Sequence, residues 1–144
     1  MNFKEFIIES YVSDIKKTLA KLPKKHAIIF RGYKYKFEGG NELKGDSKHI
    51  GFIDEEKKTV TIAAPYNYGR EFTFLHEVGH AVWKYLVDDK KQEQWAKIVK
   101  KTNLKKEDKQ PVEELFCMAY GATYAKRPPA DYAYDEWIKF VKNI

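Results

Sequence analysis

The sequence of 144 residues lacks the features that would link it by disulfides or place it in a membrane. It has a single cysteine, Cys117, so no disulfide can form within the chain. No run approaches the roughly 18 apolar residues of a membrane-spanning helix. Residues 1–17 also lack the continuous apolar segment of a signal peptide, because Glu, Asp or Lys interrupts it every few positions. We therefore expect a cytoplasmic protein without a membrane partner.

The chain also has only a small excess of positive over negative side chains. Lys and Arg number 27 and Asp and Glu number 21, which gives a formal net charge of +6. A basic excess can favour nucleic acid, but the basic clusters at 24–25, 34–36 and 100–101 match no known nucleic-acid-reading motif. We interpret the interleaved charges as a solvated surface and do not expect nucleic acid as a partner.

The composition is that of a folded domain. Hydrophobic residues make up 43% and aromatic residues 15% of the chain, which argues against disorder. A domain of this size buries roughly 68–70% of the surface that its unfolded chain exposes, without needing a structural metal. We therefore expect one domain spanning residues 1–144, in which any metal serves function.

The apolar pattern predicts a helix, then a small sheet, then further helices. Three- and four-residue steps indicate an N-terminal helix that ends near Leu22, ahead of Pro23. Residues 27–30 suggest a short buried strand and residues 33–37 alternate as a strand does, so the two form a strand pair or one long strand. Residues 41–48 are expected to be a loop. Residues 50–53 and 59–63 flank a charged turn and predict a hairpin. Helical periodicity then covers residues 70–86, 92–101, 111–124 and the segment from about residue 131. The fold class is therefore α+β, with a small and mostly antiparallel sheet.

Residues 76–80 form a His-Glu-x-x-His pattern in the most strongly helical stretch. Four residues are about one helical turn, so His76 and His80 share a face and can both bind one tetrahedral zinc ion. Glu77 lies one residue round the helix, where it can hold a water rather than bind the metal. The pattern arises by chance in a chain of this length with a probability of roughly 0.5%. We favour a zinc site over the alternative of packed core histidines.

A catalytic zinc needs a third protein ligand and an open position for water. Glu113 and Glu114 begin the helix expected from residue 111, and they point about 100° apart. Glu114 shares a face with Met118 and Ala122, an apolar row that should turn inward, so we prefer Glu114 as the ligand. Glu113 then supplies a favourable charge at the helix N-terminus. Cys117 is interpreted as a core residue rather than a ligand.

These segments resemble a known family. Residues 74–82, 113–116 and 137–144 resemble the catalytic domain of anthrax lethal factor and the related proline-proline endopeptidases, over roughly residues 59–144. Residues 70–73, which lead into the motif, are similar to the ImmA/IrrE metallopeptidases over about residues 50–125. Both resemblances imply a zincin-like fold of the gluzincin type, Zn²⁺ held by His76, His80 and Glu114, and Glu77 as the general base.

Two positions depart from the first family. Glu107 stands where the family has a tyrosine that steadies the oxyanion, and Met118 stands where it has a second carboxylate. Other tyrosines are candidate replacements for oxyanion or substrate contacts, although in a chain with ten tyrosines packing is the commoner role: Tyr66, Tyr68, Tyr120 and Tyr124. The departures favour an alternative function, a catalytically weak or inactive zincin-like module that binds or regulates a protein.

The sequence as a whole predicts a zinc metalloendopeptidase that acts on a protein or peptide substrate. Glu77 would accept the proton of a metal-activated water and return it to the leaving amine. Residues 59–63 are expected to form an exposed edge strand beside the cleft, which an extended peptide could join by strand addition.

Overall fold

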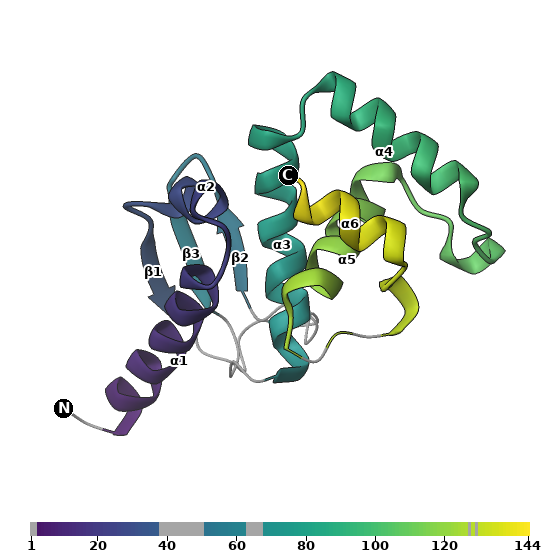
Figure 1. Cartoon of the computed structure of the whole chain (residues 1–144). Coiled ribbons are helices and arrows are strands. Elements are labelled where there is room, and N and C mark those ends of the chain that lie inside the picture. The colour runs from purple at the N-terminus through teal and green to yellow at the C-terminus, as the bar shows by residue number, and fades with distance from the viewer. Residues whose placement is uncertain (1–2, 38–50, 63–67, 127, 129) are drawn as a thin grey trace. The chain divides into compact units, whose positions relative to one another are not determined.

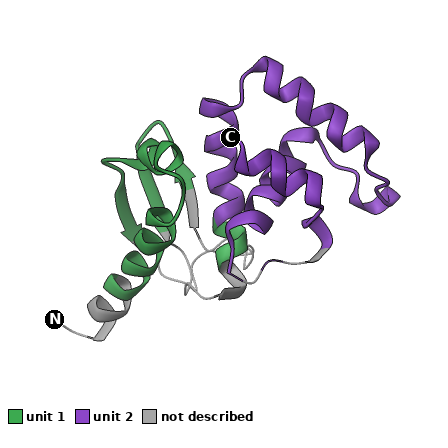
Figure 2. Cartoon of the chain, viewed as in Figure 1, with its two compact units in different colours: residues 1–74 green, residues 75–144 purple. Residues whose placement is uncertain are grey.

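The computed structural model describes residues 3–37, 51–62, 68–126, 128 and 130–144 (Figure 1). Within these residues the chain is α+β, with six α-helices, three short 3-10 helices and one three-stranded sheet. It divides into two compact units, residues 1–74 and 75–144, and the boundary falls inside helix α3 (Tyr68–Leu86) (Figure 2). The single domain over residues 1–144 stays a prediction. No helix in the described ranges is both long and apolar enough to cross a membrane.

Unit 1 begins with helix α1 (Phe3–Ala20), which confirms the predicted N-terminal helix. Ile15 and Leu19 are buried one turn apart, as the apolar spacing requires. The chain then passes Pro23, whose φ of −51° suits the start of another helix. Its carbonyl accepts hydrogen bonds from the backbone N–H groups of His26 and Ala27.

The predicted buried strand at residues 27–30 is wrong. These residues lie at the end of the short helix α2 (Lys24–Ala27) and in the 3-10 helix η1 (Ile28–Phe30). Phe30 is buried, but Ile28 is 56% exposed, so the apolar run is not a continuous buried segment. Four apolar residues carry no period, and the helix begun at Pro23 decides their conformation.

The sheet of unit 1 has the strand order β1-β3-β2, with β1 (Lys34–Phe37), β2 (Gly51–Asp54) and β3 (Thr59–Ile62). β2 and β3 form the predicted antiparallel hairpin, in which the carboxylate of Asp54 accepts from the N–H of Lys57 at 3.0 Å. β1 pairs with β3 in parallel. The sheet is therefore mixed, and the prediction of a mostly antiparallel sheet is wrong, because local patterns identify strands but not their long-range partners. The predicted loop at 41–48 lies outside the described residues.

The prediction of an exposed edge strand at residues 59–63 is also wrong. β3 is the central strand, so both of its edges are already hydrogen-bonded to neighbouring strands. Thr59, Val60 and Thr61 are all buried. Their burial on both faces matches their β-branched character. Residue 63 itself lies outside the described residues.

Unit 2 holds the rest of α3 together with helices α4 (Asp89–Lys101), α5 (Val112–Tyr124) and α6 (Asp135–Lys142). These helices confirm the helical segments predicted from residues 70, 92 and 111. The last helix begins at Asp135 rather than near residue 131, because the 3-10 helix η3 (Ala130–Tyr132) precedes it. The polar connection at 102–110 includes the 3-10 helix η2 (Lys106–Asp108).

The core of unit 2 is a cluster of aromatic rings around Phe116 of α5. Phe116 has no exposed surface, and its ring centroid lies between 5.2 and 6.4 Å from those of four other rings, Trp83, Trp95, Tyr120 and Phe140. Such tilted and edge-to-face contacts are favourable beyond the area they bury. The cluster brings side chains of α3, α4, α5 and α6 together.

Two indole N–H groups, of Trp95 in this cluster and of Trp137 packed against it, fix the ends of helices. Trp95 of α4 donates to the carbonyl of Val112 at 2.7 Å, and Trp137 of α6 donates to the hydroxyl of Thr102 at 2.9 Å. Buried indoles need such partners. Because Val112 is the first residue of α5, the bond from Trp95 holds the turn that carries Glu113 and Glu114.

Candidate metal centre

Gly79 of α3 lies close to α5. A Cβ atom added there would lie 3.0 Å from the Cα of Cys117 and 3.2 Å from the Cβ of Tyr120, tighter than most Cβ contacts in proteins. A glycine inside a helix costs roughly 0.5–1 kcal/mol relative to alanine. Here it permits the close crossing, which brings side chains of α5 within reach of the two motif histidines.

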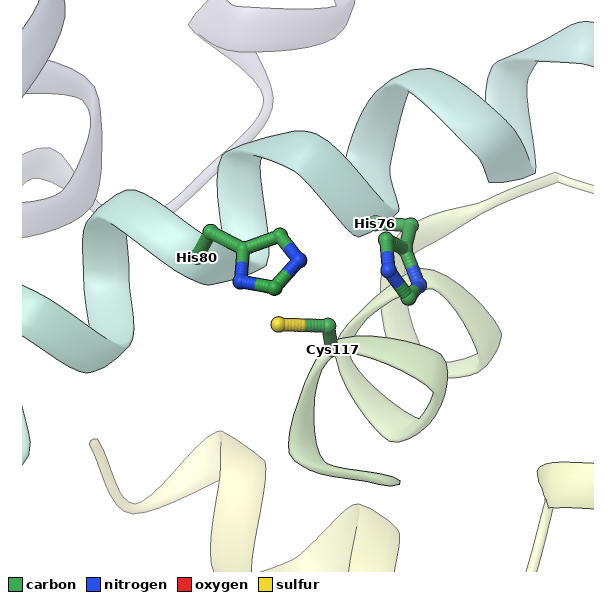
Figure 3. Close-up of side chains that lie close together, drawn as sticks. All are labelled: His76, His80 and Cys117. Atoms are coloured by element: carbon green, nitrogen blue, oxygen red, sulfur yellow. The ribbon is translucent and has the colours of Figure 1, made fainter. Parts of the chain in front are cut away.

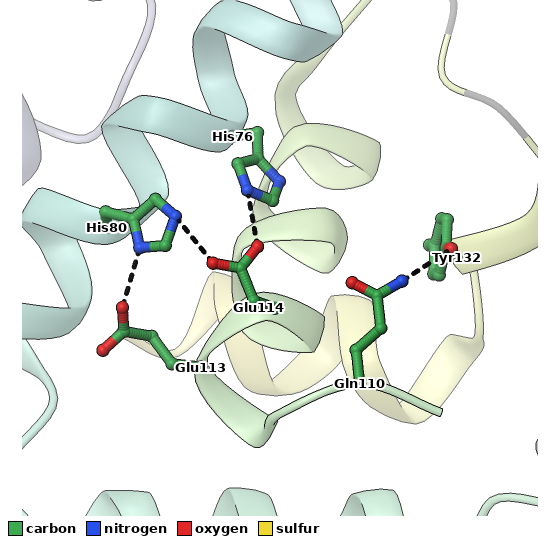
Figure 4. Close-up of polar contacts among 6 residues, drawn as sticks. All are labelled: His76, His80, Gln110, Glu113, Glu114 and Tyr132. Carbon is green, nitrogen blue, oxygen red and sulfur yellow. Dashed lines mark hydrogen bonds and ion pairs between the residues drawn. The ribbon is translucent and has the colours of Figure 1, made fainter. Parts of the chain in front are cut away.

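His76 and His80 lie on the same face of α3, as their spacing predicts, with ring centroids 5.1 Å apart. The Nε2 atom of His76 is 3.0 Å from Oε2 of Glu114, and the Nε2 atom of His80 is 3.1 Å from Oε1 of Glu114 (Figure 4). The carboxylate of Glu114 therefore lies between the two imidazoles. The three residues predicted as metal ligands come together at the crossing of α3 and α5.

Glu113 contacts the same cluster from the other side of His80. Its Oε2 atom is 2.8 Å from Nδ1 of His80 (Figure 4). The sequence pattern offers Glu113 as the less favoured third ligand or as a charge at the start of α5, and it does not predict this contact with Nδ1. A signal for it exists, because a metal-bound histidine normally offers its second ring nitrogen to a carboxylate or carbonyl.

Both ring nitrogens of His80 face a carboxylate. A neutral imidazole has one N–H, so it can donate to only one of the two carboxylates that face its ring nitrogens. The other carboxylate would then face a lone pair, which is repulsive. A cation between Nε2 and Glu114 is one arrangement that removes this repulsion. This arrangement also satisfies the Nε2 atom of His76.

The donor set of His76, His80 and Glu114 fits zinc. Two imidazole nitrogens and one carboxylate oxygen are a usual protein ligand set for catalytic zinc. Two ligand atoms about 2.1 Å from one tetrahedral ion are about 3.4 Å apart. The nitrogen-to-oxygen distances of 3.0 and 3.1 Å, each to a different oxygen of Glu114, are slightly shorter than this spacing.

The protonation state of His76 suits metal binding. Burial lowers the pKa of His76 from its ordinary value, while the nearby charge of Glu114 partly opposes this shift. The imidazole is therefore neutral at neutral pH, the form that binds metal.

Cys117 forms a second grouping with the two histidines. Its sulfur and the ring nitrogens of His76 and His80 all lie within 4.8 Å of one another (Figure 3). The residue is fully buried, and burial raises the pKa of its thiol, with the charges of Glu114 and Glu113 adding to the shift. The prediction that Cys117 is a core residue is confirmed by its burial, and the alternative, an approach to the metal site, agrees with its place beside the histidines.

Glu77 is half-buried on α3 next to His76. Its charge acts on two members of the cluster, because it raises the pKa of both His76 and Cys117. Its part as a general base stays a prediction. At the two positions that depart from the resemblance, Glu107 is exposed in η2 and Met118 is half-buried on α5.

The candidate tyrosines are placed unequally. Tyr120 is fully buried, with its ring 6.2 Å from that of Phe116 and 4.9 Å from that of Tyr124, which indicates packing. Burial raises the pKa of both Tyr120 and Tyr124. Tyr66 lies outside the described residues, and Tyr68 is described only as the first residue of α3. A role for any of them in binding substrate stays a prediction.

A polar pair steadies the approach to α5. The amide of Gln110 donates to the hydroxyl of Tyr132 in η3 at 3.5 Å (Figure 4). The pair links the segment just before α5 to η3 and so adds to the hold of Trp95 on the first turn of α5.

No family model, no curated protein and no solved structure matches this chain. The resemblances based on residues 70–82, 113–116 and 137–144 thus remain expectations. We therefore infer a function from the contacts among His76, His80, Glu113 and Glu114.

Proposed function

We propose that the chain is a zinc-dependent peptidase. The observation that carries the proposal is the position of the Glu114 carboxylate, with its two oxygens 3.0 and 3.1 Å from the Nε2 atoms of His76 and His80. Three donors of the kinds that zinc prefers converge there, and two of them belong to the His-Glu-x-x-His motif.

The residues divide the chemistry between ligands and base. His76, His80 and Glu114 would hold a zinc ion, which when bound polarises a peptide carbonyl and makes a water more acidic. Glu77 accepts a proton from the attacking water and returns it to the leaving amine. A bond from the water oxygen to the carbonyl carbon forms, the bond from carbon to nitrogen breaks, and the proton ends on the amine.

The wider proposal follows the resemblances. A zincin-like fold of the gluzincin type, a cytoplasmic location and a protein or peptide substrate all belong to this proposal. The contact between α3 and α5 at Gly79 supports it, because the motif helix and the helix of the third ligand cross at the cluster.

The test is cleavage profiling of a diverse peptide library by mass spectrometry. We expect the zinc-loaded protein to cut peptides, and we expect a chelator to stop the cutting and added zinc to restore it. The Glu77→Gln variant should bind zinc as tightly as the parent protein and cut at least about 100-fold more slowly, since it lacks the general base. Cutting at the parent rate by Glu77→Gln would refute the assignment of Glu77.

Cys117 favours a second function, a zinc-binding module that binds a protein partner without hydrolysis. With the thiolate of Cys117 added to His76, His80 and Glu114, four protein ligands would close the site, as in structural zinc centres. Cobalt substitution separates the two functions. A sulfur-to-cobalt absorption band that disappears in Cys117→Ser, together with no cutting by the metal-loaded protein, supports the module. An open site gives no such band.

A further inference from the structure

Glu113 and His80 make the shortest polar contact of the cluster. The distance of 2.8 Å from Oε2 of Glu113 to Nδ1 of His80 is in the range of a hydrogen bond between a nitrogen and a charged carboxylate. We propose that Glu113 is a positioning residue that holds the proton of His80 on Nδ1. The lone pair of Nε2 then points at the metal. This inference rests on the zinc site of the proposed function.

A neutral histidine has two tautomers. The proton can be on Nδ1 or on Nε2, and only the first form leaves Nε2 free to bind metal. A carboxylate that accepts from Nδ1 selects that form and fixes the ring orientation. It also makes Nε2 a stronger donor to the metal.

Neighbouring positions on α5 allow the two glutamates to serve different atoms. Glu114 projects between the two histidines, whereas Glu113 reaches the far side of the His80 ring (Figure 4). The rotation of about 100° between adjacent helix positions produces this division. One ring therefore has a carboxylate on each nitrogen, and a metal at Nε2 removes the conflict that this arrangement otherwise creates.

A plain charge role must be separated from positioning. Glu113 is in the first turn of α5, where any negative charge is favourable. A charge role is lost equally when Glu113 becomes glutamine or methionine. A positioning role is kept in part by glutamine, because its amide oxygen can still accept the Nδ1 hydrogen, and is lost with methionine.

The experiment measures zinc affinity by competition with a chromophoric chelator, using the full chain. We expect Glu113→Met to lose about 10- to 100-fold in affinity and Glu113→Gln to lose clearly less. Glu136→Gln is the matched control, since Glu136 is an exposed carboxylate in the first turn of α6. It should leave zinc affinity unchanged. Nitrogen-15 NMR of the zinc-loaded protein should show the Nδ1 proton of His80 in the parent and its loss in Glu113→Met.

The outcomes separate this inference from the proposed function. Equal losses in the glutamine and methionine variants, or no loss in either, overturn the positioning role while the zinc site stands. Failure of the parent protein to bind zinc overturns both. Zinc binding with the predicted order of variants but no peptide cleavage supports the positioning role and refutes the peptidase. Thermal unfolding of the metal-free variants shows that each is folded, and Glu113→Gln, with its nearly unchanged shape, remains informative if Glu113→Met is unstable.

Discussion

Unit 1 and unit 2 bury different kinds of side chain. Among the largest fully buried side chains that the structure describes, unit 1 contributes two aliphatic groups and two single rings: Ile15, Val60, His26 and Phe74. Unit 2 contributes mostly large aromatic ones: Trp95, Phe116, Tyr120, Trp137, Leu75 and Leu115. The candidate metal residues are also in unit 2.

From this difference we infer that the aromatic core supports the proposed metal centre. Ligands must be held to within about 0.5 Å by neighbours whose own conformations are fixed. Large rings lose few rotatable bonds when buried and pack in defined orientations. The rings around Phe116 and the bond from Trp95 to Val112 fix the first turn of α5.

The largest contrast should come from replacing one histidine in each unit. His76→Ala removes a metal ligand, and we expect zinc affinity to fall by more than the about 100-fold that loss of an outer partner causes. His26→Ala removes a fully buried ring from unit 1 and should lower stability without changing zinc affinity. Chelator competition measures the affinities, and similar losses in both variants would contradict a site confined to unit 2.

A buried phenylalanine from each unit, Phe30 and Phe116, tests the comparison at the level of packing. Phe116→Ala should lower the free energy of unfolding by about 3–5 kcal/mol, because it leaves a cavity among four rings. It should also weaken zinc binding through α5. Phe30→Ala should destabilise the protein but leave zinc affinity as it is. Denaturant unfolding followed by circular dichroism gives the stabilities. The support role fails if Phe116→Ala binds zinc normally.

Zinc itself should stabilise one unit selectively. At a free zinc concentration 100 times the dissociation constant, binding stabilises the folded state by about 2.7 kcal/mol. We expect amide hydrogen exchange to slow in residues 75–86 and 112–124, and chelator to reverse the effect. Exchange in residues 9–36 should not change. Equal slowing of amide exchange in both units would contradict a zinc site that belongs to unit 2.

The smallest effects should come from two glycines that are needed for different reasons. Gly79→Ala overpacks the crossing, and after the gain in helix propensity we expect a loss of up to about 2 kcal/mol in stability with weaker zinc binding. Gly32 has open space around it but a φ of +80°. Gly32→Ala should therefore cost about 1–2 kcal/mol through backbone strain and leave zinc binding intact. Thermal unfolding and chelator competition together distinguish the two, and unchanged zinc affinity in Gly79→Ala would show that the crossing distance does not set the site.

The sequence predicts the part of the centre that depends on one helix. His76 and His80 are one turn apart, so any α-helix brings them together. Glu114 needs a second helix, but its place in an apolar row indicates which way it faces. The contact of Glu113 is not predicted in this way. The 100° between adjacent helix positions suggests that only one glutamate faces the metal, but the His80 ring has two nitrogens, and Glu113 contacts Nδ1 while Glu114 contacts Nε2. The position of Cys117 depends on how closely the helices cross at Gly79.

In the fold, too, the sequence predicts the local elements and not the contacts between distant segments. The predictions of long periodic helices such as α3 and α5 are confirmed. The predicted hairpin of β2 and β3, which depends on a local turn, is confirmed as well. The parallel pairing of β1 with β3 is a long-range choice that alternation does not encode. The segment at 27–30 is too short for its period to be recognised, so the helical turn begun at Pro23 decides it.

The concentration of indoles in unit 2 has an optical consequence. The chain has three tryptophans, and Trp83, Trp95 and Trp137 all belong to unit 2. Intrinsic tryptophan fluorescence therefore observes unit 2 alone, while far-ultraviolet circular dichroism observes the helices of both units. Coincident transitions from the two signals would mean that the units unfold as one cooperative body, and separate transitions would mean that each unfolds at its own midpoint.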